Sequence, residues 1–409
     1  MQNVYYFLKW MLLSAVIGGI VGVIGSIFGH GVSKATTLWN AHHWTLFFMP
    51  VAGLIIVHCY RIAHEEKNKG TDMVLESISA ATEVTPATGP LIFISTILSH
   101  AVSASAGREG AALQLGGSIG NLVGKMIHLD ERDKKVAIMC GMSACFAALF
   151  GTPLTASLFS IEVVSIGVMY FAALVPCMFS AFIGAAISGK MGLVPDHFHV
   201  GEIPEFGISG AALAILIGIL CACVGILMCS ILHKSHHAYK KYFPNPYVRV
   251  VAGSAIFIVL TLIFSSRYYN GSGMHLIEMC FHGEKVPYYA FIMKIVFTAV
   301  ALGAGFKGGE IVPALCVGAT FGYVIAAITG MPVGLCSSMG MVALFVSVTN
   351  CPVSTIFLAF ELCGFEAMPY YAIAIAVSFT MSGYYGLYHS QKFVYSKIKT
   401  EFINRKSND

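Results

Sequence analysis

The chain has 409 residues, of which 57% are hydrophobic and only 11% are charged, and its formal net charge is +4 at pH 7. A soluble globular protein cannot cover its surface with so few charged side chains, so this composition indicates a protein embedded in a lipid bilayer, with no nucleic-acid partner. At about 20 residues per crossing, the chain holds roughly a dozen or more spanning or half-spanning helices. We therefore expect an all-α polytopic membrane protein without a soluble regulatory domain.

The N-terminal segment, residues 1–32, is apolar well beyond the length of a signal-peptide core and has no small-residue cleavage site before a polar stretch. We expect a retained first helix. Basic residues concentrate in HLDERDKK, in KKYFPNPYVR and in the closing QKFVYSKIKTEFINRK. The positive-inside rule places these segments, and the C-terminus, on the cytoplasmic side of the cell (inner or plasma) membrane.

The sequence repeats itself in two halves. Six residues recur 199 positions later: Gly141, Met142, Ala144, Phe146, Pro153 and Glu162 correspond to Gly340, Met341, Ala343, Phe345, Pro352 and Glu361. The segment GTDM at 70–73 and Glu109 recur 201 positions later, as GSGM and Glu310. Many transporters are two related halves with the substrate between them. We expect a first repeat over 1–200 and a second over 201–409 that ends in a short tail.

Polar, glycine-rich breaks interrupt the apolar helices in each half. Such breaks are costly in hydrocarbon unless the freed backbone groups face a protein-lined cavity or an ion. Several of these breaks precede helices, and a helix start offers unpaired N–H groups with a partial positive charge. Converging helix starts would form an anion site without a buried cation.

The segment AGREG places Arg108 and Glu109 at the start of a glycine-rich helix. Intramembrane acids commonly mark ion or proton pathways. A carboxylate at an anion site competes with the anion for the same N–H groups and leaves when protonated, so Glu109 is our candidate gating and proton-carrying group. The alternative is a Glu109 that is paired with Arg108 and only closes a helix.

The order of motifs resembles the CLC family of chloride channels and anion–proton antiporters. GREG, GGEIVP, GTPLTASLFSIE and SGYYGLYHSQ occur in the order typical of that family, and the likeness covers nearly the whole chain. The resemblance implies inverted repeats, many tilted and half-spanning helices, and a homodimer with one anion pathway per subunit.

By the same resemblance, Glu109 matches the gating glutamate, Thr71 occupies the position of a serine hydroxyl, and Tyr388 matches the tyrosine that faces the ion. The backbone N–H groups of Glu310 and Ile311 would complete a central site. Those around Arg108, Glu109, Gly110 and Val312 would form an outer one. Read without the family, Thr71 could be a helix N-cap and Tyr388 an aromatic residue at the membrane interface.

Several departures bear on which halide is carried. Chloride members typically have proline after GREG and GxFxP in the second half, whereas this chain has Ala111 and GGEIVP, which resemble the fluoride-exporting bacterial branch. That branch usually has Asn or Met at the position of Thr71 and threonine at the position of Val312. The choice between fluoride and chloride stays open.

The proton route also departs from the chloride antiporters, because Val163 stands where they have a second proton-transfer glutamate. Glu310 is our candidate for a carboxylate on this route, with a structural hydrogen-bonding role as its alternative. For Glu162 and Glu361 we expect hydrogen bonds to backbone N–H groups rather than a role in transport.

The sequence therefore predicts halide transport coupled to proton antiport, with a passive voltage- or pH-gated chloride channel as the alternative. The histidines are scattered without metal-ligand spacing, and no catalytic motif occurs, so we expect no metal, no cofactor and no enzymatic activity.

Overall fold

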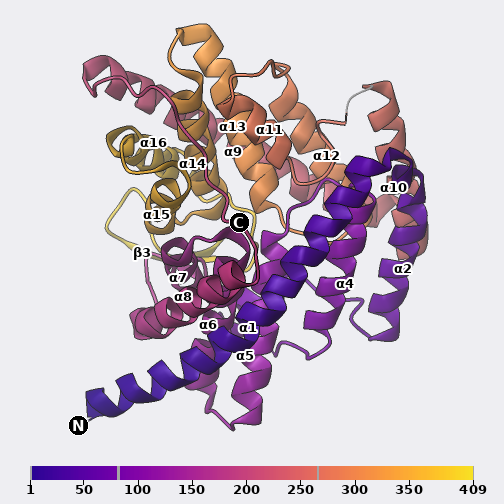
Figure 1. Ribbon diagram of the computed structural model, residues 1–409, viewed down its shortest axis with the longest axis vertical. Helices are drawn as coiled ribbons and strands as arrows, with labels where there is room; N and C mark the ends of the chain where they lie inside the picture. Colours follow the sequence, from indigo (N-terminus) through magenta and orange to yellow (C-terminus); the bar gives the residue numbers. More distant parts are fainter. Residues whose placement is uncertain (1, 81–82, 265–266, 409) are drawn as a thin grey trace.

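The computed structural model describes residues 2–80, 83–264 and 267–408 of the chain (Figure 1). Within these ranges, eight α-helices lie in the first half: α1 (Gln2–Ala41), α2 (Met49–Ile62), α3 (Thr71–Ser79), α4 (Thr88–Ala101), α5 (Glu109–Met126), α6 (Glu131–Phe150), α7 (Pro153–Glu162) and α8 (Leu174–Lys190). Eight more follow: α9 (Ile208–Tyr242), α10 (Pro246–Ile263), α11 (Met274–Phe281), α12 (Ala290–Ala304), α13 (Ile311–Thr329), α14 (Val333–Thr349), α15 (Pro352–Cys363) and α16 (Met368–Met381). The expected helical membrane architecture is confirmed.

The helices differ widely in length. By length and composition, six apolar helical segments among the described residues could cross a membrane; they contain α1, α2, α8, α9, α10 and α13. Others are much shorter, and the 10 residues of α7 extend over only about 15 Å of a hydrocarbon core that is about 30 Å thick. The short helices begin or end inside the protein, where helix termini can form a site.

Helices of each half pack in corresponding pairs. The helix α5 packs on α6 as α13 packs on α14, and α1 packs on α8 as α9 packs on α16. In Figure 1 the two halves interlock: α10 of the second half lies beside α2 of the first at one edge, and α7 of the first half packs on α15 of the second.

Glycines bring these paired helices close together. A Cβ added at Gly116 of α5 would lie 2.1 Å from the Gly141 carbonyl oxygen of α6, and one at Gly340 of α14 would lie 2.3 Å from the Gly318 oxygen of α13. Small residues allow such close approach of membrane helices, whose association depends on van der Waals packing.

Two glutamates cap helices of the opposite half. Glu162, at the end of α7, accepts hydrogen bonds from Val353 N at 3.0 Å and Ser354 N at 2.8 Å at the start of α15. Glu361 of α15 accepts equivalent bonds from the first N–H groups of α7, with Leu154 N at 2.9 Å and Thr155 N at 2.8 Å. The expected pairing of both glutamates with backbone N–H groups is confirmed.

A small sheet, not predicted from the sequence, joins the tail to the first half. Strand β1 (Ser165–Ile166) pairs in parallel with β2 (Lys392–Tyr395), which pairs antiparallel with β3 (Phe402–Lys406). The strand β1 directly follows α7, so the sheet holds the C-terminal segment against the helical body.

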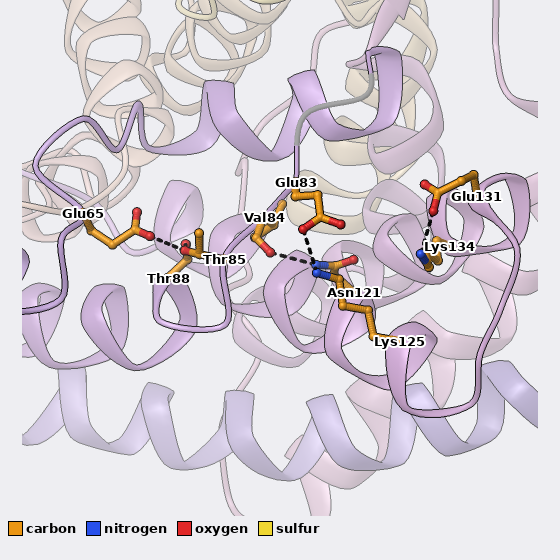
Figure 2. A network of polar contacts seen from close by, with 9 residues as sticks. All are labelled: Glu65, Glu83, Val84, Thr85, Thr88, Asn121, Lys125, Glu131 and Lys134. Atoms are coloured by element: carbon orange, nitrogen blue, oxygen red, sulfur yellow. Dashed lines mark hydrogen bonds and ion pairs between the residues drawn. The ribbon is translucent and has the colours of Figure 1, made fainter.

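Polar contacts fasten the connection between α3 and α4 to α5 (Figure 2). Lys125 forms an ion pair with Glu83 at 3.0 Å, and Asn121 Nδ2 donates to Val84 O at 2.8 Å. Thr85, in the same connection, donates to Glu65, which lies in the segment between α2 and α3. This network lies at the C-terminal end of α5, whereas the candidate site lies at its N-terminal end.

Candidate anion-binding site

The two glycine-rich breaks lie against each other. Gly107 N donates to Gly309 O, and Gly309 N donates to Gly107 O, both at 2.7 Å. Two residues beyond each glycine a helix begins, α5 at Glu109 and α13 at Ile311. The bridge therefore places two helix N-termini side by side, and their unpaired N–H groups converge.

Glu109 occupies this pair of N-termini. Its side chain is fully buried, and Val312 N donates to its Oε2 at 3.2 Å. The other oxygen, Oε1, has no hydrogen-bond partner among the described residues. A buried carboxylate oxygen without a partner is costly, so this position is poised to release the side chain.

Arg108 does not pair with Glu109. Its Nη2 lies 2.9 Å from Asp196 Oδ2, in the segment between α8 and α9. The predicted alternative of a Glu109–Arg108 ion pair is therefore not found in the part of the chain that the structure describes. The Arg108 guanidinium is engaged elsewhere, which leaves its backbone at the helix start as its contribution to the site.

Thr71 is the first residue of α3, and the N-cap position belongs to Gly70, whose φ of +66° suits glycine. The Thr71 hydroxyl donates to Gly110 O at 3.3 Å and accepts from Gln114 Nε2 at 3.4 Å. Since Gly110 and Gln114 both belong to α5, this hydroxyl connects the start of α3 to the helix that begins with Glu109. The N-cap alternative for Thr71 is wrong by one position.

Tyr388 lies in the segment between α16 and β2 and is only 4% exposed. Asp72 holds this segment, because it accepts hydrogen bonds from Ser390 N at 2.8 Å and Ser390 Oγ at 2.6 Å. The carboxylates of Glu310, Asp72 and Glu109 lie near enough to act electrostatically on Tyr388. Tyr388 is therefore a buried residue beside the two glutamates and not an interfacial aromatic.

Glu310 occupies the N-cap position of α13 and is half-buried. The two following residues, Ile311 and Val312, are buried. Asp72 and Tyr388 are its electrostatic neighbours. Three helix starts, those of α3, α5 and α13, thus surround two carboxylates, a hydroxyl and a phenol, an arrangement suited to binding a small anion and moving protons.

Three polar residues near this site were missed by the sequence analysis. Gln114 contacts Thr71, Asp72 anchors the Tyr388 segment, and Lys294 is fully buried in α12. Lys294 Nζ donates to Ser105 Oγ at 2.9 Å and to the carbonyl oxygens of Tyr269 and Gly271. Lys294 is the one charged residue of the apolar helix α12, which was the available signal for it. Gln114 shares α5 with Ser118, Asn121 and Lys125, so the sequence held no such signal there.

The sequence matches the family described as "Voltage gated chloride channel" over residues 52–383. The chain belongs to this family. It is a family of channels and transporters and not of enzymes.

Relatives within the voltage-gated chloride channel family cover most of the chain. A "Chloride/fluoride channel protein" of Pseudomonas syringae pv. tomato is 32% identical over 399 residues, 96% of this chain and 88% of that protein. An "H(+)/Cl(-) exchange transporter ClcA" of Yersinia pestis is 22% identical over 384 residues, 86% of this chain and 80% of the relative.

Solved structures agree with this placement. The crystal structure of a CLC-type fluoride/proton antiporter aligns with a TM-score of 0.90 and 29% identity, covering 94% of this chain and 98% of that one. A slow cyanobacterial Cl−/H+ antiporter aligns with a TM-score of 0.77 at 18% identity, covering 91% and 94% of the two chains, which shows the shared fold.

Proposed function

We propose that this chain exchanges a halide anion for protons across the membrane and that Glu109 is both its gate and its proton carrier. The observation that carries the proposal is the hydrogen bond from Val312 N to the buried Glu109 carboxylate. The carboxylate binds at a helix N-terminus, where a free anion would bind. Protonation removes its charge, so the halide can displace it and the proton travels with the side chain.

Neutral donors would hold the halide in this pathway. We assign this role to the Tyr388 hydroxyl and to the N–H groups at the starts of α5 and α13, which are those around Arg108, Gly110, Ile311 and Val312. The Thr71 hydroxyl, now donating to Gly110 O, would turn toward the ion. Hydroxyl and amide donors attract an anion without fixing a full opposite charge beside it, which allows the ion to leave.

Glu310 is our candidate for the second proton-carrying group. It matches Glu109 in the repeat, and Asp72 and Tyr388 are its electrostatic neighbours. A proton carried inward by Glu109 would pass to Glu310 when the Glu109 side chain turns toward Tyr388.

Fluoride is the halide that we favour. The relatives that support it are the fluoride/proton antiporter of known structure and the chloride/fluoride channel protein, which are 29% and 32% identical. Ala111 and the GGEIVP segment point the same way, whereas Thr71 resembles the chloride members.

We further propose that residues 1–200 and 201–409 form two inverted repeats of one membrane domain. The matched helix pairs and the reciprocal glutamate caps support this division. By family resemblance we expect a homodimer in the cell membrane, and by the distribution of basic residues a cytoplasmic C-terminus.

The decisive experiment measures halide efflux and proton movement together in proteoliposomes loaded with fluoride or chloride. We expect fluoride efflux with proton uptake, and we expect Glu109→Gln to abolish proton movement because an amide cannot carry the proton. The matched control is Glu131→Gln, which changes an exposed glutamate of α6.

Efflux by the unaltered protein without any change of internal pH would contradict antiport and favour the channel. A Glu109→Gln variant that still moved protons would contradict the role of Glu109. Preference for chloride would revise the halide alone and leave the mechanism standing.

A further inference from the structure

Two histidines stack beside Tyr388. The rings of His233, in α9, and His389, directly after Tyr388, have centroids 3.9 Å apart and planes inclined by 33°. His233 Nε2 lies 3.2 Å from Leu387 O. The imidazole pair is therefore fastened to the segment that carries Tyr388, on both sides of that residue.

Exposure falls in steps from this pair to the candidate anion site. His389 is exposed, His233 is half-buried, and Tyr388 is buried. The pair therefore connects the protein surface with the residues around Tyr388.

Acidic groups continue inward from the pair. Asp72, which accepts two hydrogen bonds from Ser390, acts electrostatically on both His233 and Glu310. Cys229, one turn before His233 on α9, is also an electrostatic neighbour of Glu310. Asp72 thus lies between the imidazole pair and the glutamate of α13 as the acidic group that both sense electrostatically.

Basic groups lie on the outward side. His236, three residues after His233 and exposed, has Lys240, Lys307 and Arg249 as electrostatic neighbours. These cations would raise the halide concentration at this part of the surface.

We propose that His233 and His389 receive protons from Glu310 through Asp72 and release them at this surface. This inference rests on the proposed antiport. Imidazole suits the step because it binds and releases a proton near neutral pH, with a usual pKa of about 6.5. A proton moves from a neutral carboxyl group to an imidazole nitrogen, which leaves a carboxylate and forms imidazolium, and then from imidazolium to water, which restores the neutral ring.

The test compares exchange by the unaltered chain with that of the double variant His233→Gln, His389→Asn and of His389→Asn alone. The matched control is His237→Gln, which changes an exposed histidine of the same helix. Proton and halide fluxes are recorded in proteoliposomes across a range of pH, with and without added free imidazole.

We expect the double variant to slow proton-coupled exchange near neutral pH by about a hundredfold, the low end of what a positioned proton-transfer group contributes. Free imidazole should restore much of the rate, a response that a purely structural role would not give. The single variant, altered only at an exposed residue, should fold normally and show a smaller loss that free imidazole also restores.

Unchanged rates and pH profiles in both variants, or losses that imidazole does not restore, would overturn the inference. Halide flux without proton movement in the unaltered chain would instead contradict the antiport itself, and that result is obtained before any variant is compared.

Discussion

At the residue scale, the backbone at Gly107 lies in close contact with the Glu109 carboxylate. A Cβ added there would lie 2.0 Å from Glu109 Oε2 and 3.1 Å from Pro313 Cδ. The glycine therefore leaves space that the Glu109 side chain fills. Two backbone hydrogen bonds join Gly107 to Gly309, so the Gly107 backbone cannot easily move away from Glu109.

Gly107→Ala should consequently displace the Glu109 side chain from its position at Val312 N. Overpacking a fitted site costs about 1–3 kcal/mol, so we expect the population with Glu109 seated to fall by about 5- to 150-fold. Halide leak without proton movement should rise, as measured by efflux from proteoliposomes. Gly19→Ala is the control, because a Cβ at that glycine of α1 meets nothing within 4 Å. If the Gly107→Ala variant still exchanged halide for protons without a halide leak, the proposed displacement of Glu109 would be contradicted.

At the scale of single elements, the short helices α7 and α15 stabilise each other end to end. Each begins with proline, which has no N–H to leave unpaired, and each receives a glutamate from the other at its following N–H groups. Carboxylates at helix N-termini satisfy these donors and favour the helix dipole. The reciprocal pair joins the two halves inside the apolar interior.

Glu162→Ala should therefore destabilise the protein without acting on the gate. It leaves Val353 N, which is partly buried, and Ser354 N, which is buried, without their acceptor, which we expect to cost about 2–4 kcal/mol. Thermal unfolding followed by circular dichroism in detergent would show this as a lowered Tm, while Glu366→Ala, at an exposed residue, should leave the Tm unchanged. Equal melting of the two variants would show that the cap carries little stability.

At the scale of the whole molecule, the C-terminal residues contact the segment that carries Tyr388, which completes a candidate site begun at Glu109 in the first half. Ser407 N donates to Gln391 O at 2.9 Å, and Gly386 N donates to Asn408 Oδ1 at 3.2 Å. These contacts bracket Tyr388 on both sides. The tail is therefore a structural part of the Tyr388 segment.

Ending the chain at Lys399 should weaken halide binding, because the Tyr388 segment loses β3 and both contacts. A loss of about 1–2 kcal/mol corresponds to a 5- to 30-fold lower affinity, measurable by isothermal titration with the halide in detergent. The full-length variant Lys406→Ala, which changes an exposed residue of β3, should bind normally. Full affinity in the shortened chain would show that the remaining contacts suffice.

The sequence alone was enough to predict the membrane setting, the repeated order of helices and breaks, and the placement of Glu109 and Glu310 at helix starts. These features are local: apolar length, glycine-rich interruption and proline at a helix start act within a few residues of each other. The family resemblance added Thr71 and Tyr388, which the structure places next to α5 and beside Glu310.

The tertiary structure alone decided which groups meet. Arg108 pairs with Asp196, Asp72 holds Ser390, and His233 stacks on His389. The partners in these pairs are separated by roughly 90 to more than 300 positions, and no periodicity or motif links them. Each contact depends on the tertiary packing of distant segments, and the Asp72–Ser390 contact joins the two halves. Burial in an apolar interior forces polar groups to find partners wherever the fold brings one within reach.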